Sequence, residues 1–425
     1  MLLRTLLRTS SASVGLPLFV IFVLVALGDD LTSFVTDNYW PSATGSATFA
    51  LAFISTGCAG LGAWEGARLQ RGRVFSQISV RSPLEIIAPR LTPVIIAGLI
   101  GMLVALIVTA NAAGVSTGMP DLGVLIIEAL LLTANTLGGF VIGGRWSAVI
   151  SVPLTIVAAF VANAYPISWD IMWPRHLVGG GLHNCCAVDE VLDTRAVWSA
   201  ALFALALSVA AAYIIQAQAS RRAISAAVAI VAVGTAAGGL LAQGLSADPV
   251  QARNTSALDC ESNEAGRVCL WPEVRQSDRV RSETWKVLAR LAGAGIPLPS
   301  TFTMAGRPTQ GEAKLAIPPN ATPADIPSGV VSGLMPPPPA CAVDHEYPAG
   351  AATEPMAAWL LLTAGSPVDT VRAQVPQEAA AVAEKVKHES RQAQLAWYQG
   401  NIEAMRTCTE HPLSDVPKGA SWSGG

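Results

Sequence analysis

Seven apolar stretches, each close to the length that crosses a lipid bilayer, constrain the fold of this chain most strongly. A transmembrane helix needs about 20 mostly apolar residues to cross roughly 30 Å of hydrocarbon. The stretches are residues 11–28, 46–64, 91–112, 122–143, 147–165, 196–216 and 223–243. The last stretch is rich in alanine and glycine and therefore only weakly hydrophobic. We expect an all-α polytopic membrane bundle of about seven spans, and its parity depends on that last stretch.

Charged residues divide the chain into two parts near residue 245. They make up only 13% of the whole chain, against about 25% in soluble domains. Residues 1–245 hold 12 basic and 11 acidic side chains, whereas residues 246–425 hold 15 and 19. The sequence therefore predicts a transmembrane helical domain over residues 1–245, a small, mostly helical, disulfide-braced soluble domain over 246–411, and a disordered tail over 412–425.

Arginines beside the apolar stretches indicate how the chain is oriented. Basic residues near the ends of spans favour the cytoplasmic side. With a cytoplasmic N-terminus, ten basic residues fall inside and two fall outside. The ten are Arg4, Arg8, Arg68, Arg71, Arg73, Arg81, Arg90, Arg145, Arg221 and Arg222, and the two are Arg175 and Arg195. Seven crossings then place the C-terminal domain on the extracytoplasmic side of the membrane.

The first apolar stretch has a second interpretation. Its basic start, its short apolar region and the small residues Ala26 and Gly28 also fit a cleaved signal peptide. Cleavage would leave the orientation of every later segment unchanged, so the predicted location of the soluble domain does not depend on this choice.

The positions of the cysteines agree with this orientation. Six of the seven fall in segments assigned to the outside, and Cys58 lies within a span. Disulfides persist in oxidising compartments. Four cysteines in the soluble domain allow three pairings, of which we favour a local bond between Cys260 and Cys269 and a long-range bond between Cys341 and Cys408.

Two questions about the cysteines remain open in the sequence. A zinc site is the weaker alternative in the soluble domain, because the cysteine spacing is not that of a zinc knuckle and His345 and Glu346 form no helical ligand pair. The adjacent Cys185 and Cys186 either bond elsewhere or stay free, since a bond between neighbours is unusual.

The segment between the second and third stretches, residues 65–90, is the longest cytoplasmic segment and is strongly basic. We expect Val74–Ile78 to form part of a short amphipathic helix at the membrane interface, where a cytoplasmic partner binds. The alternative is a basic loop that only sets the topology. The candidate partner-coupling residues are Arg71, Arg73 and Arg81.

The segment between the fifth and sixth stretches, residues 166–195, is too apolar and aromatic for a plain linker. Tryptophans favour the headgroup level of a membrane, so we expect short interfacial helices broken at Pro174 and at residues 179–181. The alternative is an aromatic belt with a loose loop. The candidate residues of an outer gate are Trp169, Trp173, Cys185 and Cys186.

One ionisable residue lies within a span. Glu128 belongs to the fourth stretch, and Asn135 follows seven residues later on nearly the same helix face. Such groups are costly in hydrocarbon and usually face a bundle interior or a wet cavity. We treat the pair as a candidate intramembrane polar site, with simple access of Glu128 to water at the span end as the alternative.

The soluble domain reads as a hairpin followed by helices. Residues 260–274 predict a hairpin stapled by its two cysteines, with Trp271 in a packed corner. An amphipathic helix is expected over residues 275–293 from its apolar spacing. The remaining expected helices are residues 354–364, 367–373 and 377–408, the last with a break near Glu389.

Several functional classes lack support. No HExxH, GxSxG or Walker-type sequence occurs, so we expect no enzyme and no cofactor. A net charge of -3 argues against nucleic acid as a main partner. Membrane lipid and further copies of the same chain remain as expected partners.

The layout of residues 1–220 resembles the permeases of type-2 ATP-binding-cassette exporters. The segments NYWPSATGSATFA and RSPLEIIAPR, which lead into the second and third stretches, also resemble uncharacterised multi-spanning actinobacterial proteins of this type. The resemblance implies a separate cytoplasmic ATPase that couples to the first loop, and an outer loop that gates the exit. The seventh stretch and the exported domain depart from that family's usual pattern.

Two other functions stay open at this point. The spans could anchor a binding or scaffold domain that recognises envelope components or a partner protein. A membrane-embedded enzyme that uses Glu128 or His183 has no motif to support it.

Overall fold

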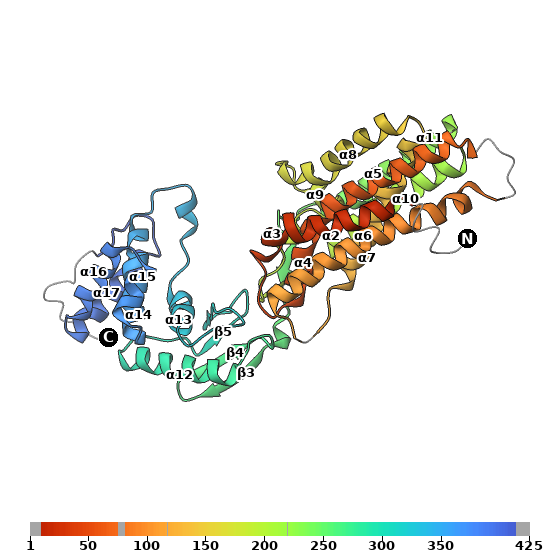
Figure 1. The fold of residues 1–425 in the computed structure, drawn as a ribbon. Helices are drawn as coiled ribbons and strands as arrows, with labels where there is room; N and C mark the ends of the chain where they lie inside the picture. The colour runs from red at the N-terminus through yellow and green to blue at the C-terminus, as the bar shows by residue number, and fades with distance from the viewer. Residues whose placement is uncertain (1–9, 75–80, 117, 219, 414–425) are drawn as a thin grey trace. The chain divides into compact units, whose positions relative to one another are not determined.

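The computed structural model describes residues 10–74, 81–116, 118–218 and 220–413, and it divides the chain into two compact units. Unit 1 is Met1–Gln251 and unit 2 is Ala252–Gly425. The described part of the chain is mostly helical (Figure 1). Each unit has its own core, and each is described by itself below.

Unit 1 is a bundle of long apolar helices. They are α2 (Ala12–Ala26), α5 (Leu51–Arg71), α6 (Pro83–Ala113), α7 (Leu122–Gly143), α8 (Ala148–Ala164), α10 (Thr194–Gln216) and α11 (Arg221–Ala242). Six helical stretches in the described residues are long and apolar enough to cross a membrane. The expectation of a multi-span helical membrane protein is therefore confirmed. α2, with 15 residues, is shorter than these six.

The expected cytoplasmic loop over residues 65–90 is wrong in its bounds. α5 continues to Arg71, and α6 begins at Pro83 behind Ser82. Basic residues in the last turn of α5 favour its C-terminal end, and Ser82 and Glu85 form a capping box that starts α6. Most of the amphipathic helix expected at Val74–Ile78 lies outside the described residues.

The last stretch forms the 22-residue helix α11. The expectation that it is only weakly hydrophobic is wrong, because its mean hydropathy of 2.1 exceeds the 1.9 of α7. Alanine is the strongest helix former, so the abundant alanines of this segment also favour its helix. Ser220 caps the first turn by accepting a hydrogen bond from the Ala223 backbone N–H.

Glycines bring α5 and α7 into backbone contact. A Cβ atom on Gly139 would collide with the carbonyl oxygen of Ala59, and one on Gly143 would collide with that of Ala63. Small residues at such positions let membrane helices approach closely. By contrast α8 lies at the edge of the bundle (Figure 1), where Val149 is 84% exposed.

Short elements complete unit 1. Helix α4 (Trp40–Ala47) and one 3-10 turn run directly into α5, so Trp40–Arg71 is one helical stretch of 32 residues. The other short elements are α3 (Gly28–Thr32), α9 (Trp173–Leu177), and the paired strands β1 (Glu190–Leu192) and β2 (Val250–Ala252).

Unit 2 combines a small mixed sheet with six helices in its described part. The sheet order is β3 (Asp259–Asn263), β4 (Gly266–Leu270), β5 (Thr301–Thr303), β6 (Glu312–Lys314). β3 and β4 form an antiparallel hairpin, whereas β5 pairs in parallel with both neighbours. The helices are α12 (Ser277–Gly293), α13 (Ile326–Leu334), α14 (Thr353–Ala364), α15 (Val368–Gln374), α16 (Gln377–Lys387) and α17 (Arg391–Ala404).

Both expected disulfides of the soluble domain are present. Cys260 and Cys269 lie directly opposite each other on the β3–β4 hairpin and are bonded. Cys341 and Cys408 form the second bond, across 67 residues of sequence. The alternative of a zinc site is wrong, because all four cysteines form disulfides and none is left as a zinc ligand.

The expected tail begins later than residue 412. The backbone carbonyl of Leu413 accepts hydrogen bonds from Trp397 (2.7 Å) and Asn401 (3.3 Å), and the Leu413 N–H donates to Asn401. These contacts attach Leu413 to α17. Residues 414–425 lie outside the described part of the chain.

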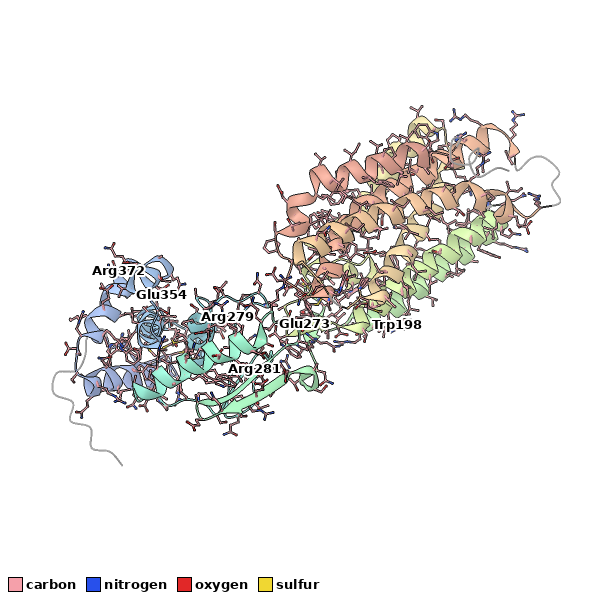
Figure 2. The ribbon with its side chains drawn as sticks, turned by 60° about the horizontal axis from the view of Figure 1, so that its bottom comes forward. Trp198, Glu273, Arg279, Arg281, Glu354 and Arg372 are labelled. Atoms are coloured by element: carbon pink, nitrogen blue, oxygen red, sulfur yellow. A yellow bond between two sulfur atoms is a disulfide. The ribbon has the colours of Figure 1, made fainter. Side chains whose placement is uncertain are left out.

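A buried arginine joins the hairpin of unit 2 to α12 (Figure 2). The Arg281 side chain is almost fully buried and pairs with the carboxylates of Asp259, Glu261 and Asp278, the second at 2.9 Å. The corner at Trp271 is packed as expected, and its indole N–H donates to the Met304 carbonyl at 2.9 Å.

Candidate functional site

The segment between α8 and α10, residues 165–193, forms a packed cap on unit 1, which we call the α8–α10 cap. Its short helix α9 contacts α10 and α11, and its turn at residues 182–184 contacts α4. Cys185, Cys186 and Leu182 share one hydrophobic cluster with Tyr39. The expectation of short helices in this segment is confirmed. The alternative, an aromatic belt with a loose loop, is not observed.

Proline does not break a helix in the cap. The expectation of a break at Pro174 is wrong, because Pro174 occupies the first turn of α9. A proline is tolerated there, since the first N–H groups of a helix have no intrahelical partner. The helix ends at Leu177, and Gly179 and Gly181 follow with positive φ angles of 74° and 84°.

Two buried basic side chains hold the cap in shape. The Arg175 guanidinium donates from Nη2 to the carbonyl oxygens of Ile167 (2.8 Å) and Trp169 (3.2 Å). The Nε2 atom of His176 lies 3.1 Å from the carbonyl oxygen of Ser246, and because a carbonyl only accepts, Nε2 donates. Burial lowers the pKa of His176, which keeps the neutral ring favoured.

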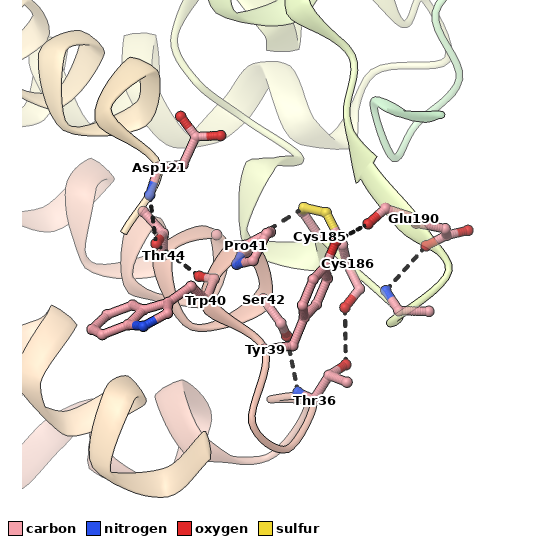
Figure 3. The surroundings of a disulfide bond; sticks show 12 residues. Thr36, Tyr39, Trp40, Pro41, Ser42, Thr44, Asp121, Cys185, Cys186 and Glu190 are labelled. Atoms are coloured by element: carbon pink, nitrogen blue, oxygen red, sulfur yellow. Dashed lines mark hydrogen bonds between the residues drawn. A yellow bond between two sulfur atoms is a disulfide. The ribbon is translucent and has the colours of Figure 1, made fainter. Parts of the chain in front are cut away.

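The adjacent cysteines are bonded to each other and sit against α4 (Figure 3). Thr36 donates its hydroxyl hydrogen to the Cys186 carbonyl at 2.9 Å. A Cβ atom on Gly45 of α4 would lie 2.9 Å from the Cys185 carbonyl oxygen, so only glycine allows this approach. Both alternatives expected from the sequence, bonds elsewhere or free thiols, are therefore wrong.

The four expected gate residues do not form one cluster. Trp169 is 44% exposed and meets Tyr165 edge to face, with ring centroids 6.3 Å apart. Trp173 instead packs on the backbone of α11 at Gly239. Cys185 and Cys186 lie on the α4 side of the cap. The residues therefore belong to one cap but contact different helices.

Among the described residues, the expected intramembrane pair is not joined by a hydrogen bond. Glu128 is buried in α7, and its Oε1 atom has no hydrogen-bond partner among the described residues. Asn135 instead pairs across to α8, where Asn163 donates to Asn135 Oδ1 at 3.0 Å. Asn163 was missed because a single asparagine near the end of an apolar stretch carries no signal until the facing helix is known.

Glu65 is a second buried polar residue that the sequence did not single out. It is 1% exposed, although it was expected in a cytoplasmic loop. Its Oε1 atom accepts a hydrogen bond from the Ser11 backbone N–H (2.7 Å) and lies 3.3 Å from Arg68 Nη1. The start of α2 is thereby attached to the C-terminal end of α5.

The expected coupling residues surround the connection between α5 and α6. Arg71 ends α5, Arg73 follows it, and Arg81 precedes α6, all with exposed side chains. The helical stretch Trp40–Arg71 therefore contacts the α8–α10 cap near one end and carries the coupling arginines at the other.

Unit 2 carries a separate open pocket of about 270 Å³ near the start of α12. Its lining includes Arg275, Gln276, Arg279 and Asn320 beside apolar Ile326. Within the described residues, no group of three or more His, Cys, Asp or Glu side chains could hold a metal ion.

These features define a helical membrane protein with six candidate spans and a C-terminal unit that contains two disulfides. Residues 268–408 match a family model described as a domain of unknown function, DUF7224. The match lies within unit 2 and ends at Cys408, the second cysteine of the long-range bond. No curated protein and no solved structure matches the chain.

Proposed function

We propose that the chain is the non-enzymatic, permease-like membrane subunit of an exporter driven by a separate cytoplasmic ATPase. The observation that carries the proposal is the single helical stretch Trp40–Arg71. At one end it packs against the α8–α10 cap, and at the other it ends in the basic connection to α6. A displacement of that connection would thus be transmitted to the cap by a continuous helix.

The inner end of this stretch is attached firmly enough to transmit a displacement. Glu65 binds both Arg68 and the backbone of Ser11, and α5 is in backbone contact with α7 through Gly139 and Gly143. The hydrogen bond from Ser11 to Glu65 is buried, and leaving a buried acceptor unsatisfied costs about 1–3 kcal/mol, so this attachment resists separation. α2, α5 and α7 would move as one body.

In this proposal the N-terminus and the coupling arginines face the cytoplasm, and unit 2 lies outside a bacterial cell membrane. Arginine bias at the helix ends supports this orientation. The two disulfides of unit 2 support an oxidising location. It requires seven crossings, with α2 as the seventh in spite of its 15 residues.

The test is capture of the ATPase by the full chain. The chain is purified together with ATPases encoded by neighbouring genes, and the bound ATPase is quantified. The variant Arg71→Ala/Arg73→Ala/Arg81→Ala is expected to lose most of the captured ATPase. A matched variant with three exposed arginines of unit 2 replaced, Arg279→Ala/Arg307→Ala/Arg406→Ala, should capture as much as wild type. Equal capture by all three proteins, or no capture by any, contradicts the proposal.

A second candidate function is a membrane-anchored binding or scaffold protein. The pocket beside Arg275 and Arg279 favours it, because two guanidinium groups next to an apolar wall suit an acidic partner from the envelope. The one carboxylate in the lining, Glu283, is paired with Lys286 at 2.9 Å. Loss of the partner upon Arg275→Ala/Arg279→Ala, with ATPase capture absent in wild type, would support this function over export.

A further inference from the structure

Two adjoining cavities lie along α7, α10 and α11, and together we call them the α7–α11 groove. The larger cavity, about 450 Å³, is lined only by apolar residues and glycine. The smaller cavity, about 340 Å³, lies at the C-terminal ends of α7 and α10. Val141 and Ile214 line both, so the two cavities are neighbours. Each is within the range of ligand pockets, about 300–1,000 Å³.

The apolar part of the groove opens outward from the bundle. Val228 of α11 lines it and is 64% exposed. Gly138 of α7 also lines it, and a Cβ atom there would meet no atom within 4 Å. Because α7, α10 and α11 are all candidate spans, the medium outside this opening is hydrocarbon. The opening therefore suits an acyl chain.

The other end of the groove is basic. Arg145 lines the smaller cavity, and no described residue pairs with its exposed guanidinium. Gln218 lines the same cavity, and Arg221 and Arg222 follow it at the start of α11. Among the described lining residues of the groove there is no carboxylate. An uncompensated positive charge at the end of an apolar channel calls for an anionic group.

We propose that the α7–α11 groove binds an anionic glycerophospholipid, with an acyl chain along Gly138 and Val228 and the phosphate at Arg145. Basic pockets between membrane helices are suited to anionic headgroups. A zwitterionic phospholipid also has a phosphate, but its ammonium group would approach the Arg145 guanidinium. The site therefore distinguishes the two headgroup classes. The proposal requires only that these helices lie in a bilayer, and it does not depend on transport.

Native mass spectrometry of the full chain in detergent tests the proposal. Phosphatidylglycerol or phosphatidylcholine with the same acyl chains is added, and the lipid that stays bound is counted. Wild type is expected to retain phosphatidylglycerol preferentially. Arg145→Gln should reduce that retention about fivefold, the effect of one basic residue on an anionic lipid. Gly138→Phe fills the groove and should abolish it.

Matched controls separate the groove from the surrounding lipid shell. Val149→Phe alters an exposed lipid-facing position of α8, and Arg90→Gln removes an arginine of α6; neither residue lines the groove. Both should bind as wild type does. Equal retention of the two lipids by wild type, insensitive to Arg145→Gln, overturns the proposal in favour of a nonspecific shell. If Gly138→Phe does not fold, unchanged phosphatidylglycerol retention by the exposed Arg145→Gln variant still overturns it.

Discussion

The Cys260–Cys269 bond could be predicted from the sequence, whereas the burial of Glu65 could not. The difference is the sequence distance to the residues that each contacts. The cysteines are nine residues apart on a hairpin, and local turn and strand signals are enough to predict that they meet. Glu65 is buried because Ser11, 54 residues earlier, donates its N–H to it. No local sequence pattern indicates that α2 packs on α5. Glu65 was therefore predicted to lie in a cytoplasmic loop only because it is charged and follows an apolar stretch.

His176 makes a pH-dependent contribution to stability. Burial holds its pKa in the folded protein below the unfolded value, which is about 6.5. As pH falls below about 6.5, the unfolded chain binds a proton that the folded chain does not, so the free energy of unfolding decreases. Above that pH both states are neutral and this penalty is absent.

The variant His176→Gln is therefore expected to lose part of the acid sensitivity of wild type. Melting temperatures of both proteins are measured from pH 7.5 to pH 5. The wild-type advantage should be largest at pH 7.5 and should shrink toward pH 5. His345→Gln, which changes an exposed histidine of unit 2, is the control. Parallel curves for wild type and His176→Gln would contradict the assignment.

At the scale of elements, the positions of the helices could be predicted from the sequence. The side of each helix that packs against a neighbour could not. The fourth apolar stretch coincides with α7, because a continuous apolar run fixes a span by length alone. Gly138 and Gly139 are neighbours in that run, yet only Gly139 faces the α5 backbone. The partner helix α5 determines which glycine is packed and which faces open space. The sequence of α7 alone does not carry this information.

This contrast predicts different outcomes at the two glycines. Gly139→Val forces its side chain into the Ala59 carbonyl oxygen and should cost more than the ~1–3 kcal/mol of ordinary overpacking. A Cβ atom at Gly138 meets no atom within 4 Å, so Gly138→Val should keep the stability of wild type. Thermal stability in detergent measures both. Equal losses at the two positions would show that α5 and α7 do not pack through Gly139.

Helix α13 illustrates an element that local propensity does not predict. Its sequence, IPSGVVSGL, contains two glycines, which disfavour helices, whereas its proline lies in the first turn and is tolerated there. The glycines are needed because a Cβ atom on Gly329 would lie 2.9 Å from the Ala316 carbonyl oxygen, and one on Gly333 would collide with that of Lys314. Tertiary packing beside β6 therefore overrides propensity.

For the whole molecule, the division into two units was visible in the charge density, and the topology depends on α2 and α11, of which only α2 is marginal in length. The structure divides the chain after Gln251, near the expected residue 245. α11 is apolar and long enough to span, whereas α2 is short. The number of crossings, and hence the side on which unit 2 lies, depends on whether both cross.

Reporter fusions give the expected outcome for topology. A phosphatase that is active only outside the cytoplasm is fused after residue 220 or after residue 300. The fusion after residue 300 should be active and the one after residue 220 inactive. A fluorescent protein that matures only in the cytoplasm should give the reverse pattern. Activity of the phosphatase at neither position would place unit 2 in the cytoplasm and reject the exported domain.

The two disulfides of unit 2 should contribute unequally to its stability. Loop-closure entropy grows with the length of the closed loop, so the bond across 67 residues is worth about 4 kcal/mol and the bond across nine about 2.5 kcal/mol. Chemical unfolding of Cys341→Ser and Cys260→Ser variants of the full chain measures the difference. A reductant should then destabilise each variant less than it destabilises wild type. A larger loss for Cys260→Ser contradicts this ranking.

The spacing of these bonds also imposes an order on biosynthesis. At about 5–20 residues per second, Cys269 follows Cys260 within roughly two seconds, whereas Cys408 follows Cys341 only after roughly 3–13 seconds. During that interval Cys341 is a reduced thiol in the growing chain. Early closure of the hairpin bond removes the two nearest competitors for it. The short bridge thus protects the fidelity of the long one before α14–α17 have been made.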